Sequence, residues 1–236
     1  MHRVLAFRAV TMDANAEFTP HLDRLPLPQQ KLWAELVAVP PEFVLYGGTA
    51  IALHLGHRES VDFDFFSNRS FDPSQLAAAL PFMANAQITQ REPNTLTGIV
   101  DRAGPVKVFF FGVPDIPRLV PPHESAHNRL KVASLLDLAG MKASVVQVRA
   151  EAKDYIDIDA LITVGGIDLP TALAAGRAIY GQQFNPEITL KALSFFDDGN
   201  LRQLPDALKT RLATAARNVD LDRLPDISAR DQELER

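Results

Sequence analysis

The sequence contains no cysteine, which excludes disulfides, thiol nucleophiles and zinc sites with cysteine ligands. No apolar run approaches the roughly 18 residues that a membrane-spanning helix needs. Charged residues interrupt residues 1–18, where a signal peptide would carry its apolar segment. These absences predict a cytoplasmic protein with no membrane partner.

Neither sign of charge is in large excess: 24 Lys and Arg against 29 Asp and Glu give a formal net charge of −5. A negative balance argues against broad binding to nucleic acid. However, residues 220–236 hold six acids and three arginines, whereas residues 129–153 hold five basic residues and two acids. An RNA partner is therefore not excluded, and its contact is predicted to be local and sensitive to salt.

The hydrophobic period of the sequence changes near Pro121 and Pro122. Before this point, the pattern predicts strands at 43–46, 61–66, 86–92, 94–101 and 105–112, with helices at 28–37, 50–55 and 73–83. After a short strand at 130–132, nearly all of residues 135–217 have the helical period. The expected fold is α+β, with an α/β core (1–122), a mainly helical part that completes a shared cleft (123–219), and a loosely ordered acidic tail (220–236).

Gly47, Gly48 and Thr49 lie between a predicted strand and the helix that Thr49 is expected to begin. Glycines allow the backbone to approach a ligand closely, and the start of a helix offers unpaired N–H groups and a positive dipole end. This arrangement is one way to build a phosphate site. A simple turn between strand and helix is the commoner reason for such a pair of glycines.

Asp62 and Asp64 are two residues apart on a predicted strand, so both carboxylates project from the same face. Two aligned carboxylates repel each other, and a hard divalent cation such as magnesium relieves the repulsion and also bridges substrate phosphates. The alternative is a half-buried strand whose acidic face lies in water. The order of the glycine turn and the Asp-Phe-Asp strand favours the metal site.

A third candidate block is helical and runs from Lys142 to Leu161, with the sequence KASVVQVRAEAKDYIDIDAL. Lys142 and Arg149 are seven residues apart and Lys153 and Asp157 four apart, so each pair shares a helical face. Without the upstream motifs, a solvated helix with routine Lys–Asp pairs would explain this block.

Together these motifs resemble the DNA polymerase β-like nucleotidyltransferase superfamily, and more narrowly the AbiEii/AbiGii toxin-type nucleotidyltransferases. The resemblance rests on Gly47-Gly48-Thr49, on His57-Arg58-x-Ser60-x-Asp62-Phe63-Asp64-Phe65-Phe66, and on the Lys…Arg-x-x-x-Lys-Asp-x-x-Asp block. It implies a mixed sheet with flanking helices, followed by a helical C-terminal half. It also implies an activity, the transfer of a nucleoside monophosphate from a nucleoside triphosphate to a hydroxyl of tRNA, other RNA or protein. The protein would be the toxin of a type IV toxin–antitoxin or abortive-infection system, and its partner would be a cognate antitoxin.

The resemblance also implies roles for individual residues. Asp62 and Asp64 would bind Mg²⁺ or Mn²⁺, Lys142 would contact the triphosphate, and Asp157 would assist the acceptor or the metal site. The implied catalytic residues are Asp62, Asp64, Lys142 and Asp157. The implied nucleotide-binding residues are Gly47, Gly48, Thr49, Arg58, Ser60, Lys142, Arg149 and Lys153, with Asp154 in a supporting role.

One departure from the wider superfamily concerns the predicted strand 105–112, where many members carry a third carboxylate. Residues 106–111 read VKVFFF and offer none, although Lys107 could approach the site. Either Asp157 completes the site, which we favour, or catalysis is weakened and the protein binds a nucleotide or a partner without turnover. Phe109, Phe110 and Phe111 are expected to fill the core.

His123-Glu-Ser-Ala-His127 fits the H-E-x-x-H pattern of zinc proteases. Prolines precede it directly, and Asn128-Arg129 follow where a zinc-protease helix would continue with apolar residues, so a hydrated loop or a helix start is expected instead. His54 and His57 are expected to serve in capping or packing.

Overall fold

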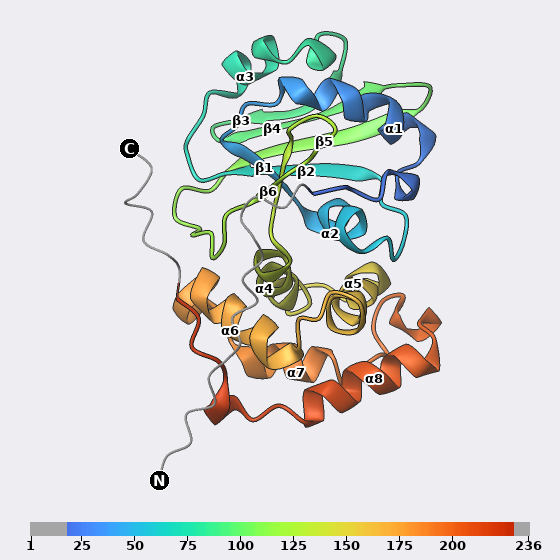
Figure 1. Ribbon diagram of the computed structural model, residues 1–236, viewed down its shortest axis with the longest axis vertical. Coiled ribbons are helices and arrows are strands. Elements are labelled where there is room, and N and C mark those ends of the chain that lie inside the picture. Colours follow the sequence, from blue (N-terminus) through green and yellow to red (C-terminus); the bar gives the residue numbers. More distant parts are fainter. Residues whose placement is uncertain (1–17, 229–236) are drawn as a thin grey trace.

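The structure, a computed structural model, describes residues 18–228. Its centre is a seven-stranded mixed sheet with the order β3-β4-β5-β2-β1-β7-β6 (Figure 1). The strands are β1 (Phe43–Tyr46), β2 (Asp62–Ser67), β3 (Gln87–Glu92), β4 (Thr95–Asp101), β5 (Pro105–Gly112), β6 (His123–Glu124) and β7 (Lys131–Val132). Strand β2 is antiparallel to β1 and parallel to β5, and it lies between them. Residues on β2 therefore have neighbours from both halves of the sheet.

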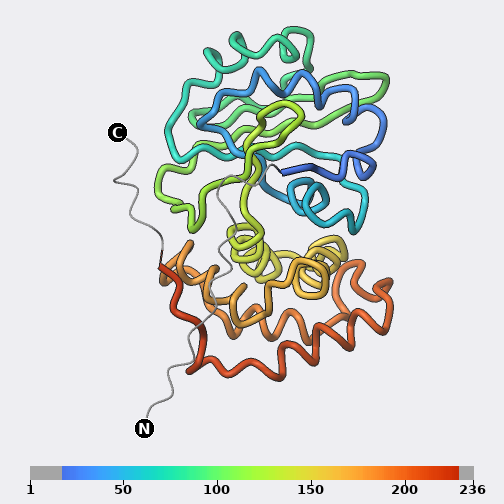
Figure 2. The backbone as a smooth tube through the Cα atoms, in the orientation of Figure 1, coloured from blue at the N-terminus to red at the C-terminus, as the bar shows by residue number. Residues whose placement is uncertain are grey.

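Helices cover both faces of this sheet. The α-helices are α1 (Leu27–Trp33), α2 (Gly47–Leu55), α3 (Pro73–Ala79), α4 (Leu135–Val145), α5 (Ala152–Thr163), α6 (Leu169–Tyr180), α7 (Pro186–Ala192) and α8 (Asp206–Arg217). In Figure 1, α1 and α3 lie above the sheet, and α2 lies between the sheet and the layer formed by α4 to α8. After β7 the chain passes into this helical layer and stays there through α8 (Figure 2).

Short 3₁₀ helices connect several of these elements. They are η1 (Leu22–Arg24), η2 (Ala34–Ala38), η3 (Pro81–Met83), η4 (Gly181–Gln183), η5 (Leu201–Gln203) and η6 (Leu221–Arg223). No helix in residues 18–228 is long and apolar enough to cross a membrane.

Burial explains the different patterns of β1 and β2. All four residues of β1 are buried, as its continuous apolar run predicts. Strand β2 alternates instead: Phe63 and Phe65 are buried in the core, whereas Asp62, Asp64 and Phe66 are partly exposed on the opposite face. The alternation fixes both aspartates on the face that looks toward α2 and the helical layer.

Two main hydrophobic clusters lie on either side of α4. The first is built on the sheet and includes Leu138 and Ala139 of α4, and the second lies among the C-terminal helices and includes Ala143 and Val146. Because α4 contributes to both clusters, it holds the sheet and the helical layer together. The division at residue 122 stays a prediction, and the two short strands that follow it, β6 and β7, join the sheet.

Most element positions predicted from the sequence lie within a few residues of the observed ones. One difference is that α2 begins at Gly47, so Thr49 lies inside the helix rather than capping it, while Gly56 ends the helix in the left-handed conformation as expected. Another is that residues 220–228, expected to be loosely ordered, form η6 and pack Leu221 and Leu224 against the second cluster. Residues 1–17 and 229–236, which carry the expectations about a signal peptide and the end of the tail, lie outside the described residues.

Candidate active site

Asp62 and Asp64 lie at the wall of a cavity of about 450 Å³ between the sheet and the helices. Asp64 is opposite Tyr46 of β1 on one side and opposite Phe109 of β5 on the other. Among residues 18–228, no hydrogen bond or ion pair reaches either carboxylate. Both carboxylates are therefore free to bind a ligand.

The electrostatics of this pair favour a bound cation. Burial raises the pKa of Asp64 to about 6, the nearby charge of Asp62 adds to the rise, and Lys142, Lys153 and Arg149 oppose it. Oxygen ligands of this kind suit Mg²⁺ or Mn²⁺. Within the described residues, no group of three or more His, Asp or Glu side chains gathers to hold a metal. Two carboxylates that line an open cavity fit a hard divalent cation, which prefers oxygen ligands.

Gly47 and Gly48 allow the backbone to lie against two charged side chains of the cavity. Gly47 has a φ of +73°, and a Cβ atom there would lie 2.4 Å from Oδ2 of Asp64. A Cβ at Gly48 would lie 2.3 Å from a guanidinium nitrogen of Arg58. Only glycine lets the backbone pass so close to the two charged side chains.

Replacing Gly47 with alanine is expected to destabilise the protein more than the same change at Gly166. Both glycines have left-handed backbone, with φ of +73° and +70°, but nothing lies within 4 Å of a Cβ at Gly166. Gly166→Ala should therefore lower the free energy of unfolding by about 1–2 kcal/mol, through backbone strain alone. Gly47→Ala should lower it by about 1–3 kcal/mol more, because the new methyl group displaces Asp64. Urea unfolding of both variants measures the difference, and equal losses would show that Asp64 is not held against Gly47.

A buried carboxylate, Asp157 of α5, organises the cations beside the cavity. Its side chain has no exposed surface, and it accepts hydrogen bonds from His57 Nε2 at 2.7 Å and from Arg58 Nε and Nη2 at 2.7 and 2.9 Å. Lys142 Nζ lies 2.9 Å from its Oδ2. Burial alone would raise the pKa of Asp157, but the hydrogen bonds from His57 and Arg58 and the charge of Lys142 hold it well below its usual range.

Asp154 forms the second half of this buried network. Lys142 Nζ donates to its Oδ1 at 2.9 Å, and Arg149 donates to both of its oxygens at 2.7 and 3.0 Å. Burial opposes ionisation, yet the hydrogen bonds from Arg149 and the charge of Lys142 lower the pKa of Asp154. Three cationic side chains, Arg58, Lys142 and Arg149, thus share two carboxylates, and all three line the cavity, where they can offset the charge of an anionic ligand.

Comparison with known proteins identifies this arrangement. The family model of the AbiEii toxin, a nucleotidyl transferase of type IV toxin–antitoxin systems, matches residues 31–232. The chain belongs to the AbiEii family. An uncharacterised protein of Aquifex aeolicus (strain VF5) is similar to it, with 29% identity over 159 residues, or 66% of this chain and 75% of that protein.

Two solved structures have a similar fold. MenT4, a nucleotidyltransferase toxin from Mycobacterium tuberculosis H37Rv, has a TM-score of 0.56 and 15% identity over 82% of this chain and 83% of its own. An H. pylori protein assigned as a nucleotidyltransferase has a TM-score of 0.50 and 17% identity over 78% of this chain and 88% of its own. The expected fold, a mixed sheet with flanking helices followed by a helical C-terminal half, is confirmed, and AbiEii membership makes the chain a nucleotidyltransferase toxin.

The AbiEii cavity brings together most of the residues singled out in the sequence. Those that line it are Gly47, Gly48, Arg58, Ser60, Asp62, Asp64, Lys142, Arg149 and Lys153. Thr49 and Asp157 do not line it. Thr49 is buried, and its hydroxyl donates to the backbone carbonyl of Asp62 and lies 2.8 Å from the Ser60 hydroxyl, so it joins α2 to the start of β2.

His57 is a member of the site that the sequence reasoning missed. The sequence pattern predicts a role in capping or packing for His57, but its ring contacts Asp157 across 100 residues of sequence. The sequence feature that points to this role is the position of His57 at the start of the motif that includes Arg58 and Asp62. His54 does pack as expected: burial lowers its pKa to about 4, and its Nε2 lies 2.9 Å from the Ala133 carbonyl oxygen.

The expectation that Phe109, Phe110 and Phe111 fill the core holds for only one of them. Phe110 is fully buried, whereas Phe109 and Phe111 point to the other face of β5 and line the cavity. Lys107, the candidate replacement for a third carboxylate, is opposite Asp62 in register but exposed, and it does not line the cavity. Because side chains alternate along a strand, the three phenylalanines cannot share one environment.

The H-E-x-x-H segment does not form a helix. His123 and Glu124 lie in β6, so the expected loop or helix start is instead a short strand followed by a turn, and Glu124 pairs with Arg129 at 2.9 Å. In a zinc protease the two histidines lie one helical turn apart on the same face. This geometry is absent here.

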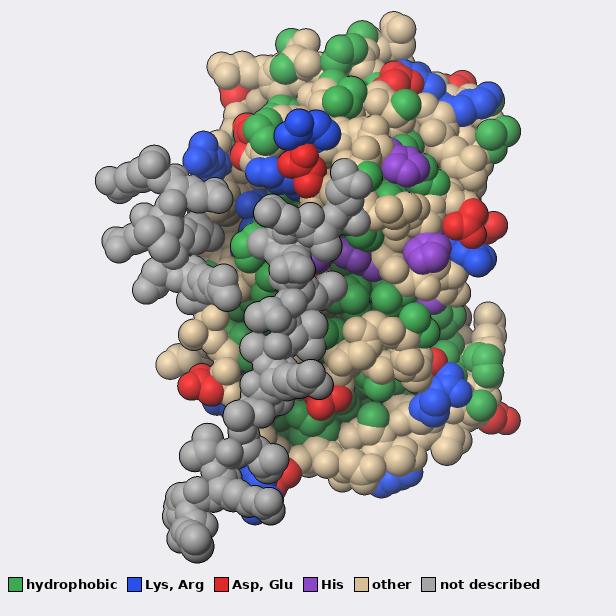
Figure 3. All heavy atoms as spheres, viewed as in Figure 1, with side chains coloured by type: hydrophobic (Ala, Val, Ile, Leu, Met, Phe, Trp, Pro, Cys, Tyr) green, Lys and Arg blue, Asp and Glu red, His purple; other side chains and the backbone are tan. Residues whose placement is uncertain are grey.

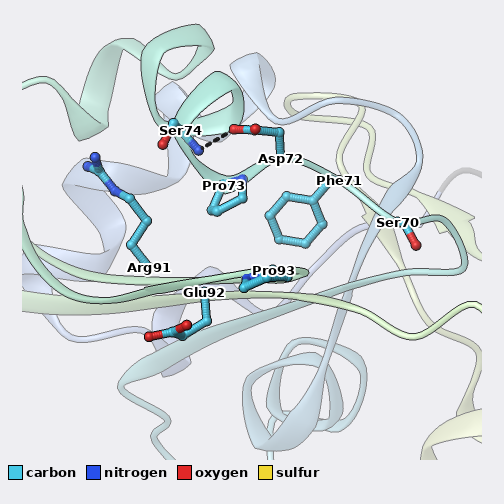
Figure 4. A pocket seen from close by; sticks show the side chains of 8 residues that line it. All are labelled: Ser70, Phe71, Asp72, Pro73, Ser74, Arg91, Glu92 and Pro93. Atoms are coloured by element: carbon cyan, nitrogen blue, oxygen red, sulfur yellow. Dashed lines mark hydrogen bonds between the residues drawn. The ribbon is translucent and has the colours of Figure 1, made fainter.

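A hollow of about 520 Å³ also lies between the start of α3 and the turn that joins β3 to β4 (Figure 4). Asp72 caps α3 by accepting hydrogen bonds from the backbone of Ser74 and Gln75. Arg91 and Glu92 point in opposite directions from β3 (Figure 4). The polar groups of this hollow do not converge, unlike those of the cavity at Asp62 and Asp64.

Proposed function

We propose that this AbiEii toxin transfers a nucleoside monophosphate from a nucleoside triphosphate to a hydroxyl of an RNA or protein acceptor. The observation that carries the proposal is the cavity, in which two free carboxylates face Lys142, Arg149 and Lys153 beside the Gly47–Gly48 turn. Such a cavity has one place for a divalent cation and an adjoining place for a chain of phosphates.

Asp62 and Asp64 would hold Mg²⁺ or Mn²⁺. When bound, the cation would supply positive charge that offsets the negative charge developing on the phosphates during transfer. The backbone at Gly47 and Gly48 lets the triphosphate approach closely, and Lys142 and Arg149 offset the charge of its outer phosphates. Catalysis of this kind depends chiefly on position and charge.

Asp157 and Asp154 act as positioning residues in this proposal. Their oxygens are already engaged by Lys142, Arg58, His57 and Arg149. They would therefore reach the substrate only through these cations, which they hold in fixed rotamers. Because a buried carboxylate already orients the cationic side chain, less free energy is needed to orient that side chain during the reaction.

The two halves of the chain would share one cleft. The residues that line the cavity come from α2, β2, the connection between them and β5 on one side, and from α4, α5 and the connection between them on the other. On the face drawn in Figure 3, basic and acidic side chains are interspersed. A nucleic-acid acceptor would be held by the local basic charge of Lys142, Arg149 and Lys153 at the cavity, and its affinity would fall as the salt concentration rises.

The direct test incubates the protein with Mg²⁺, each α-labelled nucleoside triphosphate, total tRNA and total protein. Label in an acceptor fraction above the level given by the Asp62→Ala, Asp64→Ala double variant is the expected result. Incorporation that is equal in the wild type and the double variant would overturn the proposal.

A neighbouring gene for a small DNA-binding regulator would support a cognate antitoxin.

Metal affinity is expected to depend on pH. Since the pKa of Asp64 is raised to about 6, a proton competes with the cation below that pH, and the affinity for Mg²⁺ should fall by up to about tenfold per pH unit. Above about pH 7 the affinity should level off. Calorimetric titration with Mg²⁺ from pH 5 to 8 measures this, and a constant affinity over the range would contradict it.

A second candidate is a protein that binds nucleotides without turnover. It is favoured by the residue opposite Asp64 on β5, which is Phe109 and not a carboxylate. Calorimetry that shows triphosphate binding, with binding kept in the Asp62→Ala, Asp64→Ala variant and no product formed by the wild type, would select this candidate.

A further inference from the structure

The two sides of the Asp62–Asp64 pair differ sharply in chemistry. On the β1 side lie the Gly47–Gly48 turn and the cations held by Asp154 and Asp157. On the β5 side the neighbour of Asp64 is Phe109, and the neighbour of Phe66 is Phe111. The cavity therefore has a cationic wall and an aromatic wall, with the two carboxylates between them.

The aromatic wall consists of Phe66, Phe109 and Phe111. The rings of Phe109 and Phe111 are nearly parallel, at 11°, with centroids 6.3 Å apart, and the rings of Phe66 and Phe111 are 5.3 Å apart. All three are partly exposed and line the cavity, whereas Phe63, Phe65 and Phe110 on the other face of the same strands are buried. The wall thus offers flat apolar surface to a ligand directly beside charged groups.

The stereochemistry of the proposed reaction assigns the two walls to different reactants. The acceptor oxygen forms a bond to the α-phosphorus while the bond to the bridging oxygen breaks, pyrophosphate leaves with the electron pair, and the hydroxyl proton passes to solvent. Attacking and leaving oxygens lie roughly in line. Because pyrophosphate needs the cationic wall, the acceptor must approach from the β5 side.

We propose that Phe109 and Phe111 form a stacking platform for the terminal base of a single-stranded nucleic-acid acceptor. The proposal rests on the nucleotidyl transfer set out above and adds the residues that would bind a nucleic-acid acceptor. A base presents a flat π-face that phenylalanine stacks on without regard to its identity. The β5 side of the cavity is lined by phenylalanine alone, so the platform would hold any base and would not read its edge.

The test compares the wild type with Phe109→Leu and Phe111→Leu, which keep an apolar side chain but remove the ring. The probe is a fluorescent single-stranded oligoribonucleotide, used intact or with an abasic terminal residue, and its affinity is measured by anisotropy. We expect each leucine variant to bind the intact probe about tenfold or more weakly. The abasic probe should bind the wild type and the variants equally, and Phe109→Trp should restore the affinity for the intact probe.

Phe195→Leu is the matched control, because Phe195 is 51% exposed and does not line the cavity. It should leave the binding of both probes unchanged. In transfer assays the leucine variants should raise KM for the acceptor and leave KM for the triphosphate within about twofold, since the stacking loss falls on the acceptor alone.

Three results would overturn the platform. The first is equal loss of affinity for the intact and abasic probes, the second is a higher KM for the triphosphate with an unchanged acceptor KM, and the third is transfer to protein with no binding of the oligoribonucleotide. If the wild type transfers no nucleotide at all, the proposed function fails. The anisotropy measurement still decides whether the platform binds a base.

Discussion

Asp64→Asn is expected to lower the rate of nucleotide transfer about 1000-fold or more and to leave the fold intact. Asparagine has the same shape but a weaker, neutral oxygen, so the divalent cation is lost or displaced. Several kcal/mol of charge stabilisation at the phosphates depend on that cation, and each 1.36 kcal/mol is a factor of about ten in rate.

The stability of the same variant should be equal to or higher than that of the wild type when no metal is present. Burial and the charge of Asp62 raise the pKa of Asp64 to about 6, so the ionised form is disfavoured in the folded state. Stability therefore falls as the pH rises from about 4 to about 6, the loss is complete above about pH 6, and a neutral amide removes it. Asp115→Asn, at an exposed position, is the control for both measurements. Activity within tenfold of the wild type would contradict the assignment of Asp64 as a metal ligand.

Asp157→Asn is expected to have the opposite effect on stability, with a loss of about 3–5 kcal/mol. The carboxylate is fully buried and accepts hydrogen bonds or ion pairs from His57, Arg58 and Lys142. Removing its charge leaves these cations buried with one partner fewer, and breaking a buried pair in this way is strongly destabilising. Urea unfolding at neutral pH measures the loss.

Glu151→Gln is the matched control for Asp157→Asn. Glu151 pairs with Lys153 at 3.0 Å, but both side chains are more than 40% exposed, so the pair is worth less than about 1 kcal/mol. A loss below 1 kcal/mol in Asp157→Asn, similar to that of the control, would mean that the buried network does not support the fold. Transfer activity of the variant should also fall, because Lys142 is no longer held.

The local parts of the site could be predicted from the sequence. The alternation of Asp62, Phe63, Asp64 and Phe65 requires one strand with two carboxylates on the same face, and the structure has it. The Gly47–Gly48 turn between strand and helix was equally clear. Such features depend on neighbours within a few residues, where the period of the strand and the freedom of glycine decide the geometry.

The buried network could not be predicted in this way. Asp157 meets His57 and Arg58 across about 100 residues of sequence, and nothing in the spacing of α5 indicates which side chains of the α2–β2 connection it faces. The helical motif suggested that Asp157 and Lys153 share a face, but Asp157 is buried against three cations while Lys153 pairs with Glu151. Only the packing of α5 against α2 creates that difference.

The position of Phe109 likewise depends on contacts between segments that are distant in the sequence. The run of three phenylalanines in β5 reads as core, and only the register with β2 shows that the middle one is buried while the outer two line the cavity. Register is fixed by contacts between strands, so a single apolar run does not reveal it.

The fate of two labels tests whether the cavity at Asp62 and Asp64 transfers a nucleoside monophosphate. The protein is incubated with Mg²⁺, total tRNA, total protein and each nucleoside triphosphate labelled at either the α- or the γ-phosphorus. We expect the α-label to enter the acceptor and the γ-label to leave as pyrophosphate, and we expect Asp64→Asn to abolish both. Transfer of γ-label to the acceptor, or the absence of α-label from every acceptor with all of the triphosphates, would contradict it.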